Sequence, residues 1–218
     1  MMDETLYDNI LQRRDLPLLV ERVNHAWNAE KIARVAFRDE LTPSIKAEFI
    51  LGKTILHSPA KAKHLRATQN IFETIRVHLR SRKIGEVFTE KAMIALGRND
   101  YEPDIVFFSI AKSAFFTDDQ LEFPAPDFIV EVLSDSTEKR DRGVKFEDYA
   151  EHGVGEYWIV DCDERAVEQY VIGPNGQYRL AQKVSQSVIG SVVVVGFQIP
   201  VLAIFDDNAF AEYLSRLA

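Results

Sequence analysis

The segment from Phe128 to Leu133 reads Phe-Ile-Val-Glu-Val-Leu, and it constrains the fold of this chain more than any other stretch. Apolar, largely β-branched residues predict a β-strand, and a nearly continuous apolar strand is typical of a sheet covered on both faces. Because side chains alternate along a strand, Glu131 shares one face with Ile129 and Leu133. A buried, ionised carboxylate without a partner is strongly unfavourable. The sequence therefore predicts a layered fold and a partner opposite Glu131.

The segments around this strand predict an α/β domain. Strands are expected within 47–56, where two short strands flank a turn at Gly52-Lys53, and then at 87–96, 103–110, 156–160, 167–172 and 178–180. Helices are expected at 62–82, 135–151 and 208–217, and the stretch between 180 and 205 is expected to be rich in strands. The strand, helix, strand order around 128–160 is typical of an α/β sheet. We therefore expect one α/β domain over residues 41–218.

Residues 1–40 predict a helical extension in front of this domain. Pro17 is suited to the first turn of a helix. An apolar stripe follows at helical spacing, formed by Leu19, Val20, Val23, Trp27 and Ala33. Such a stripe packs on the domain or on another subunit, and we expect it to contribute to a homodimer.

A second acid, Asp104, follows Pro103 and begins another apolar segment. The chain between Asp104 and Glu131 is long enough to turn and return beside itself, which would place both acids at neighbouring points of one sheet. Adjacent carboxylates repel each other unless a cation or a proton lies between them. Two interpretations stay open on the residues alone. Either the acids share Mg²⁺ or Mn²⁺, or Asp104 caps a turn while Glu131 pairs with Lys145 or an arginine.

Composition narrows the choice of metal and of partners. The single cysteine, Cys162, excludes a thiolate zinc site, so the ligands of a metal would be oxygen or imidazole. The net charge of −8 argues against a protein that coats nucleic acid without specificity. Two basic clusters at helix starts favour a local contact with nucleic acid, although solvated helix ends are the alternative: Lys61, Lys63 and Arg66, and Lys139, Arg140 and Arg142.

No apolar run approaches the roughly 20 residues of a membrane span. The longest near the C-terminus is Val192-Val-Val-Val195, and the first thirty residues show no signal-peptide pattern. We expect a soluble, cytoplasmic protein without a membrane partner.

Pro-Asp followed at a distance by an acid in an apolar strand is similar to the signature of PD-(D/E)XK nucleases. Three segments resemble the Uma2 family of restriction-endonuclease-like proteins: 102–106, 126–134 and 149–161. The resemblance runs from about residue 42 to 205 and leaves the N-terminal extension outside. It implies a restriction-endonuclease-like core with a mixed β-sheet flanked by helices. It also implies a metal-dependent nuclease that acts on DNA in preference to RNA.

The resemblance assigns roles to particular residues. Asp104 and Glu131 would bind the metal. The superfamily pattern puts a lysine two residues after the second acid, but that position is Leu133. The resemblance implies that the catalytic lysine has moved to the following helix, where Lys145 occupies the matching place in the segment Arg140-Asp-Arg-Gly-Val-Lys145. The alternative is a solvated helix lysine.

Two more residues match the family pattern. Glu48 matches an acid that in this family joins the metal shell and takes part in catalysis. His64 matches a histidine at the start of the following helix, which is the second candidate catalytic residue. A lone histidine on an apolar face is also typical of a hydrogen-bonded core residue. We assign no function to the other histidines, which are His25, His57, His78 and His152.

Two other functions remain open at the sequence level. A catalytically inactive nuclease fold that serves as a binding or interaction module would agree with the charge of −8 and with the displaced lysine. A hydrolase of small phosphate esters is disfavoured because the chain has no glycine-rich phosphate loop.

Overall fold

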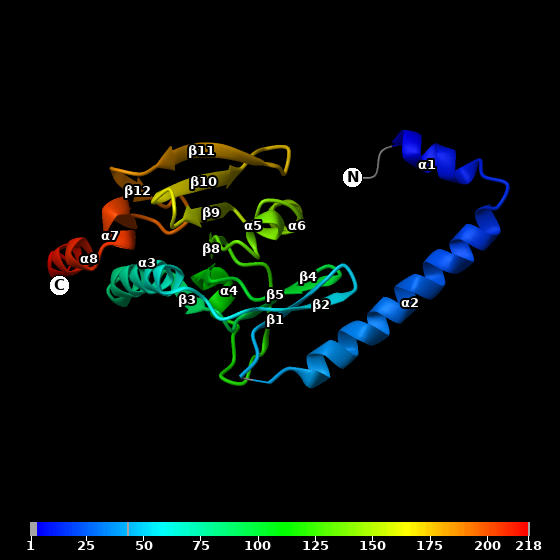
Figure 1. The fold of residues 1–218 in the computed structure, drawn as a ribbon, viewed down its shortest axis with the longest axis horizontal. Helices are drawn as coiled ribbons and strands as arrows, with labels where there is room; N and C mark the ends of the chain where they lie inside the picture. Colours follow the sequence, from blue (N-terminus) through cyan, green and yellow to red (C-terminus); the bar gives the residue numbers. More distant parts are fainter. Residues whose placement is uncertain (1–3, 43, 218) are drawn as a thin grey trace.

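The computed structural model describes residues 4–42 and 44–217 and shows a mixed α/β fold, as predicted (Figure 1). The helices are α1 (Glu4–Leu11), α2 (Leu16–Glu40), α3 (Ala62–Arg80), α4 (Ile110–Ser113), α5 (Glu138–Asp141), α6 (Val144–Glu151), α7 (Val201–Phe205) and α8 (Asp207–Ser215). The strands are β1 (Ala47–Ile50), β2 (Lys53–Leu56), β3 (Gly85–Thr89), β4 (Met93–Leu96), β5 (Asn99–Tyr101), β6 (Ile105–Ser109), β7 (Glu122–Phe123), β8 (Phe128–Val132), β9 (Glu156–Asp161), β10 (Ala166–Ile172), β11 (Tyr178–Val184), β12 (Val188–Gly190) and β13 (Gln198–Pro200). None of the described helices is long and apolar enough to cross a membrane.

The central sheet has six strands in the order β11-β10-β9-β8-β6-β3. Strand β8 pairs in parallel with β9 and antiparallel with β6. Its side chains alternate between two apolar layers, as predicted: Phe128 and Val130 pack with α3 and α7, whereas Ile129 packs in a layer with Tyr149 of α6. Both faces of the sheet are therefore covered, and Glu131 lies inside the fold.

A second sheet has five strands in the order β2-β1-β5-β4-β7. Strands β1 and β2 form an antiparallel hairpin whose turn is Leu51-Gly52, with φ angles of 49° and 80°. The turn expected at Gly52-Lys53 thus lies one residue earlier, because glycine takes the second left-handed position of the turn and Lys53 already pairs with Ile50. This hairpin brings Lys46 and Glu48 to the side of the central sheet.

The helix expected at 135–151 is two helices, α5 and α6, with a break at Arg142-Gly143. Gly143 is required at the break, because a Cβ atom there would lie 2.7 Å from the carbonyl oxygen of Lys139. The predicted end of α6 at Gly153 is confirmed, with a φ angle of 76°. The break gives α6 its own direction and aims Lys145 at the sheet.

The helical extension forms α1 and α2, and Pro17 lies in the first turn of α2. Of the described residues in α2, Phe37 alone is buried. Arg34 and Arg38 anchor the helix, because both guanidinium groups bind the buried carboxylate of Asp100 at 2.7 Å. The N-terminal part of α2 and helix α1 extend away from the rest of the fold (Figure 1).

The region 180–205 contains fewer strands than expected. Only the end of β11 and the short pair β12 and β13 are strands there, and residues 201–205 form helix α7. The helix packs Val201, Ala203 and Ile204 against the core, and Asn70 donates hydrogen bonds to its carbonyl groups. A short apolar run has no clear period, so the sequence did not distinguish a helix from a strand here.

Candidate active site

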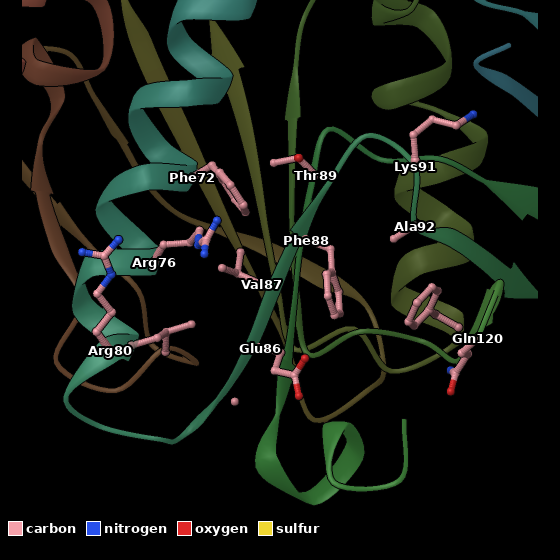
Figure 2. Close-up of a pocket in the computed structure, with 13 residues that line it drawn as sticks. Phe72, Arg76, Arg80, Glu86, Val87, Phe88, Thr89, Lys91, Ala92 and Gln120 are labelled. Carbon is pink, nitrogen blue, oxygen red and sulfur yellow. The ribbon is translucent and has the colours of Figure 1, made fainter. Parts of the chain in front are cut away.

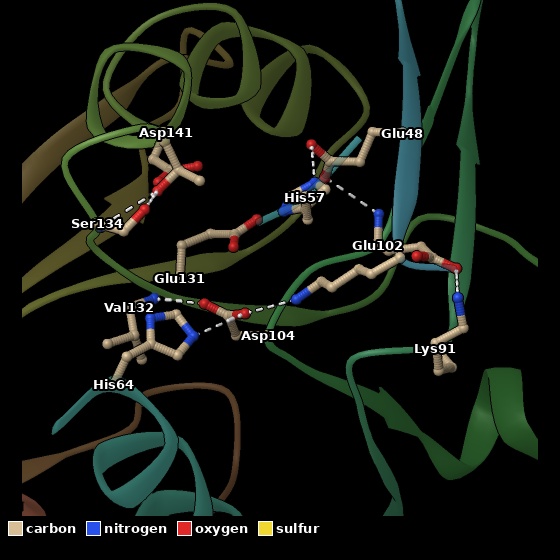
Figure 3. Close-up of polar contacts among 12 residues, drawn as sticks. Glu48, His57, His64, Lys91, Glu102, Asp104, Glu131, Val132, Ser134 and Asp141 are labelled. Carbon is tan, nitrogen blue, oxygen red and sulfur yellow. Dashed lines mark hydrogen bonds and ion pairs between the residues drawn. The ribbon is translucent and has the colours of Figure 1, made fainter. Parts of the chain in front are cut away.

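The register of the central sheet places Asp104 beside Glu131. Ile105 at the start of β6 lies opposite Val130 of β8, so Asp104 at the preceding bend lies opposite Glu131. Both acids line one cleft with a volume of about 540 Å³. Figure 3 shows Glu131 and Asp104 side by side, with His64 next to Asp104. The sequence-based expectation that the two acids are neighbours in one sheet therefore matches this geometry.

Asp104 is held as an anion. Its Oδ1 accepts a hydrogen bond from Lys46 Nζ at 2.8 Å and lies 3.4 Å from His64 Nε2, and its Oδ2 accepts the backbone N–H of Val132 at 2.9 Å. Burial favours the neutral acid, but the contact from His64 and the charge of Lys46 outweigh it and hold the pKa of Asp104 well below its usual range.

Glu131 is less well compensated. Its Oε1 accepts hydrogen bonds from Lys145 Nζ and from the hydroxyl of Tyr149, both at 2.9 Å. Burial, with the nearby charges of Asp141 and Asp104, outweighs the attraction of Lys145 and raises the pKa of Glu131 to about 8. Among the described residues no donor reaches Oε2, which leaves this oxygen available to a ligand in the cleft.

Lys145 lies at the start of α6, and its side chain is only 1% exposed. Three carboxylate oxygens surround its ammonium group: Glu48 Oε1 at 2.8 Å, Glu131 Oε1 at 2.9 Å and Asp141 Oδ1 at 3.3 Å. Burial alone would lower the pKa of Lys145, but these acids raise it well above its usual value. Lys145 is therefore a buried cation that holds three acids together, and the alternative of a solvated helix lysine does not describe it.

Glu48 lies behind Lys145. Its Oε1 accepts the backbone N–H of Glu102 at 3.2 Å as well as the lysine, and its Oε2 lies 3.1 Å from His57 Nε2. Burial opposes ionisation, but the charge of Lys145 and the contact from His57 lower the pKa of Glu48 to about 2. Both oxygens of Glu48 thus face protein groups, and its role as a metal ligand stays a prediction.

The buried charges do not balance. Among the described residues, four acids and two lysines lie in the cleft or directly behind it: Glu48, Asp104, Glu131, Asp141, Lys46 and Lys145. With these six groups ionised and the neighbouring imidazoles of His57 and His64 neutral, two negative charges remain unmatched. Burial, together with repulsion from the neighbouring acids, raises the pKa values of Glu131 and Asp141 against the attraction of Lys145. One divalent cation would balance the two unmatched negative charges.

The donor set suits a hard metal ion. Asp104 and Glu131 present carboxylate oxygens to the same cleft, which are the ligands that Mg²⁺ and Mn²⁺ prefer. Within residues 4–42 and 44–217, however, no group of three or more His, Cys, Asp or Glu side chains is already arranged around a metal position. The protein therefore offers two acids, and water or substrate oxygens would complete the coordination.

Two of the six predicted nucleic-acid contacts line the cleft. Lys61 pairs with Asp135 at 2.8 Å, and Lys63 pairs with Asp163. Among the remaining four, Arg66 binds Asp207, and Arg142 binds Glu138 and Glu168 away from the cleft. Lys139 is exposed, and Arg140 has a buried Nε without a partner in the described part of the chain. The structure thus gathers only Lys61 and Lys63 near the acids.

Sequence reasoning missed Lys46, His57 and Asp141. Lys46 precedes Glu48 by two positions, so both face the same way, and the N–H of His57 binds the carbonyl group of Lys46 across the hairpin. A hairpin with its turn at Leu51-Gly52 pairs residue 46 with residue 57. This register, read from the sequence, would have placed His57 beside the acids. Asp141 could have been found from its spacing, because it precedes Lys145 by the four residues that are typical of neighbours on a helix.

A second cavity, of about 680 Å³, lies elsewhere. It follows the outer edge of β3, between Phe72, Arg76 and Arg80 of α3 on one side and Lys91 and Gln120 on the other (Figure 2). None of the carboxylates of the cleft lines it.

The same fold occurs in a solved structure. A chain from Anabaena variabilis, described as a "putative nuclease belonging to DUF820", superposes with a TM-score of 0.63 over 75% of this chain and 90% of that chain, at 19% sequence identity. The mixed sheet, with one acid in β8 and the other at the bend before the adjacent strand β6, places the protein in the class of restriction-endonuclease-like α/β folds.

The family follows from the sequence match. The model of the Uma2 family, described as "Putative restriction endonuclease", matches residues 32–202. This chain belongs to the Uma2 family. A relative from Synechocystis sp., the uncharacterized protein sll1609, is 30% identical over 146 residues, which cover 65% of this chain and 81% of the relative. Membership in this family indicates a nuclease-like role.

Proposed function

We propose that this protein is a metal-dependent nuclease that hydrolyses phosphodiester bonds in DNA, with RNA a less favoured substrate. The observation that supports it most is the pair of Asp104 and Glu131, which face one cleft and leave Glu131 Oε2 without a hydrogen-bond donor among the described residues. The nuclease-like role of the family supports the same reaction.

The chain's own residues have distinct roles in this proposal. Asp104 and Glu131 would hold Mg²⁺ or Mn²⁺, and the bound ion supplies stabilisation of charge on the phosphate and an acidified water. His64 and Lys46 keep Asp104 ionised and ready to bind. Lys145 fixes Glu131 and Glu48 in place through its ion pairs.

The rim of the cleft supports binding of a phosphate backbone. Lys61 and Lys63 are more than one third exposed, and each is paired with an exposed acid. Exposed ion pairs are weak, so DNA phosphates can replace Asp135 and Asp163 as partners. The affinity for DNA should consequently fall as salt concentration rises.

We also propose a homodimer. The apolar stripe of Leu19, Val23 and Trp27 continues, at intervals of three and four residues, the face on which Arg34 and Phe37 contact the domain. Val23 is 57% exposed and Trp27 is 42% exposed. A second copy of this chain would cover the stripe.

Cleavage assays test the proposed reaction. Purified protein should cleave single- or double-stranded DNA with Mg²⁺ or Mn²⁺ and should be inactive with EDTA. Glu131→Gln should lose activity by about 100-fold or more, because one metal ligand is lost. If no DNA or RNA is cleaved with either metal, and Mn²⁺ does not raise the melting temperature, the inactive binding module is the better interpretation.

A further inference from the structure

The two lysines beside the acids differ in what their ammonium groups can still bind. A lysine ammonium carries three N–H donors. Lys145 faces three carboxylate oxygens at 2.8, 2.9 and 3.3 Å, and its side chain is 1% exposed. Lys145 also lines the cleft, but it donates a hydrogen bond to Glu131 Oε1 and the three acids surround its ammonium group, so little of this group faces a ligand in the cleft.

The ammonium group of Lys46, in contrast, is open to the cleft. It lines the cleft, its side chain is 21% exposed, and Nζ donates to Asp104 Oδ1 at 2.8 Å. Within residues 4–42 and 44–217 no other side chain or backbone group accepts from Nζ. Two N–H donors therefore remain for a ligand that enters the cleft beside Asp104.

The position of Lys46 is also well fixed. It immediately precedes β1, and its carbonyl oxygen accepts the N–H of His57 at 3.0 Å, which continues the pairing of β1 with β2. A group held by a strand end is placed more accurately than a group on a free loop. Lys46 thus carries a fixed positive charge next to one acid of the proposed metal site.

We propose that Lys46 is the catalytic lysine, which contacts the scissile phosphate and the attacking water, and that Lys145 is a positioning residue. This inference rests on the proposed nuclease function. The oxygen of water bonds to phosphorus, and the bond from phosphorus to the leaving oxygen breaks. Solvent accepts the proton that the water loses and supplies the proton that the leaving oxygen gains. Lys46 keeps its own protons and donates hydrogen bonds as negative charge grows on the phosphate.

A purely structural role makes a different prediction. If Lys46 only neutralises Asp104, its loss should act through stability and through binding of the metal. Lys91 provides the matched control, because it also donates to a buried carboxylate, Glu102 Oε1 at 2.8 Å, but lines the other cavity. Because Lys91 does not line the cleft, Lys91→Ala should lower stability through the loss of the partner of Glu102 but leave cleavage within about threefold of the wild-type rate.

The test combines three readouts on the full chain. Single-turnover cleavage of a DNA oligonucleotide with Mn²⁺ should fall about 100-fold in Lys46→Ala, which is typical of a lost transition-state donor. In the same Lys46→Ala variant, the rise in melting temperature on adding Mn²⁺ should persist. Its affinity for the oligonucleotide in Ca²⁺ should change by less than about fivefold, because one phosphate contact contributes little to overall binding. Added ethylammonium ions should restore part of the rate in Lys46→Ala but not in Lys145→Ala, because the Lys145 side chain is only 1% exposed and acts by holding acids in place.

The outcomes separate the two proposals. If the wild type cleaves DNA and Lys46→Ala cleaves at the same rate, the role of Lys46 is refuted while the nuclease function stands. The same holds if Lys46→Ala loses both the Mn²⁺-dependent rise in melting temperature and the response to ethylammonium, since its loss then acts through the metal. If the wild type cleaves no nucleic acid with any metal, the nuclease function fails and this inference fails with it.

Discussion

At the scale of single residues, Glu131 couples stability to pH. Its pKa is raised from 4.5 to about 8, so the folded protein keeps it protonated where the unfolded chain is ionised. The stabilisation is complete below about pH 4.5 and is lost as pH rises through about 8. In EDTA, Glu131→Gln should flatten this decline and be more stable than the wild type at pH 8, by on the order of 2 kcal/mol.

Thermal melting between pH 5 and pH 8 measures this effect. Adding Mn²⁺ to the wild type should reduce the decline, because the metal replaces the proton. Parallel melting profiles for the wild type and Glu131→Gln would show that Glu131 is ionised in the metal-free protein.

Lys145 is predicted to be the most sensitive buried charge. Lys145→Met removes the partner of three buried acids, and breaking such a pair typically costs about 3–5 kcal/mol. Lys139→Met, at an exposed position on α5, serves as the control and should change stability by less than about 0.5 kcal/mol. Denaturant unfolding compares the two variants. Similar unfolding midpoints would show that the three acids around Lys145 do not need it as a partner.

The site was only partly predictable from the sequence because its residues come from two different sheets. Asp104 and Glu131 could be paired because an acid in an apolar strand is rare and both lie in the same sheet. Lys46 contacts Asp104 from the other sheet, 58 positions away along the chain. Spacing along the strand relates Lys46 to Glu48 but contains no information about contact between the two sheets, so the contact of Lys46 with Asp104 was missed.

At the scale of elements, the break between α5 and α6 determines where Lys145 points. Gly143→Ala should lower stability by roughly 1–3 kcal/mol, because the added Cβ would overlap the carbonyl oxygen of Lys139. It should also weaken cleavage by shifting α6. Gly176→Asn is the control, since its turn is open and asparagine tolerates its φ of 74°. Equal melting temperatures for both variants would show that the break does not depend on Gly143.

Elements with strong patterns were predictable from the sequence. Strand β8 and helix α3 have long or regular apolar patterns, and their positions agree with the expectation to within a few residues. The break at Gly143 was missed because the flanking helices are short and share helical composition. Helix α7 was missed because five apolar residues carry no period.

At the scale of the whole molecule, the exposed stripe on α2 predicts self-association. Val23→Asp puts a charge at the centre of the stripe without touching the cleft, so it should shift a dimer to monomer while the melting temperature of the monomer stays unchanged. Glu21→Gln, on another face of the same helix, is the control. Analytical ultracentrifugation of the full chain distinguishes them. A wild-type monomer at micromolar concentration would refute the proposed homodimer.

The proposed nuclease depends on a divalent cation that Asp104 and Glu131 hold together. A crystal structure grown with Mn²⁺ tests it most directly, through the anomalous signal of the metal. We expect a peak in the cleft that is bound by oxygens of both carboxylates, with Lys145 still in contact with Glu131. An anomalous map without a peak between these two acids at saturating Mn²⁺ would contradict it.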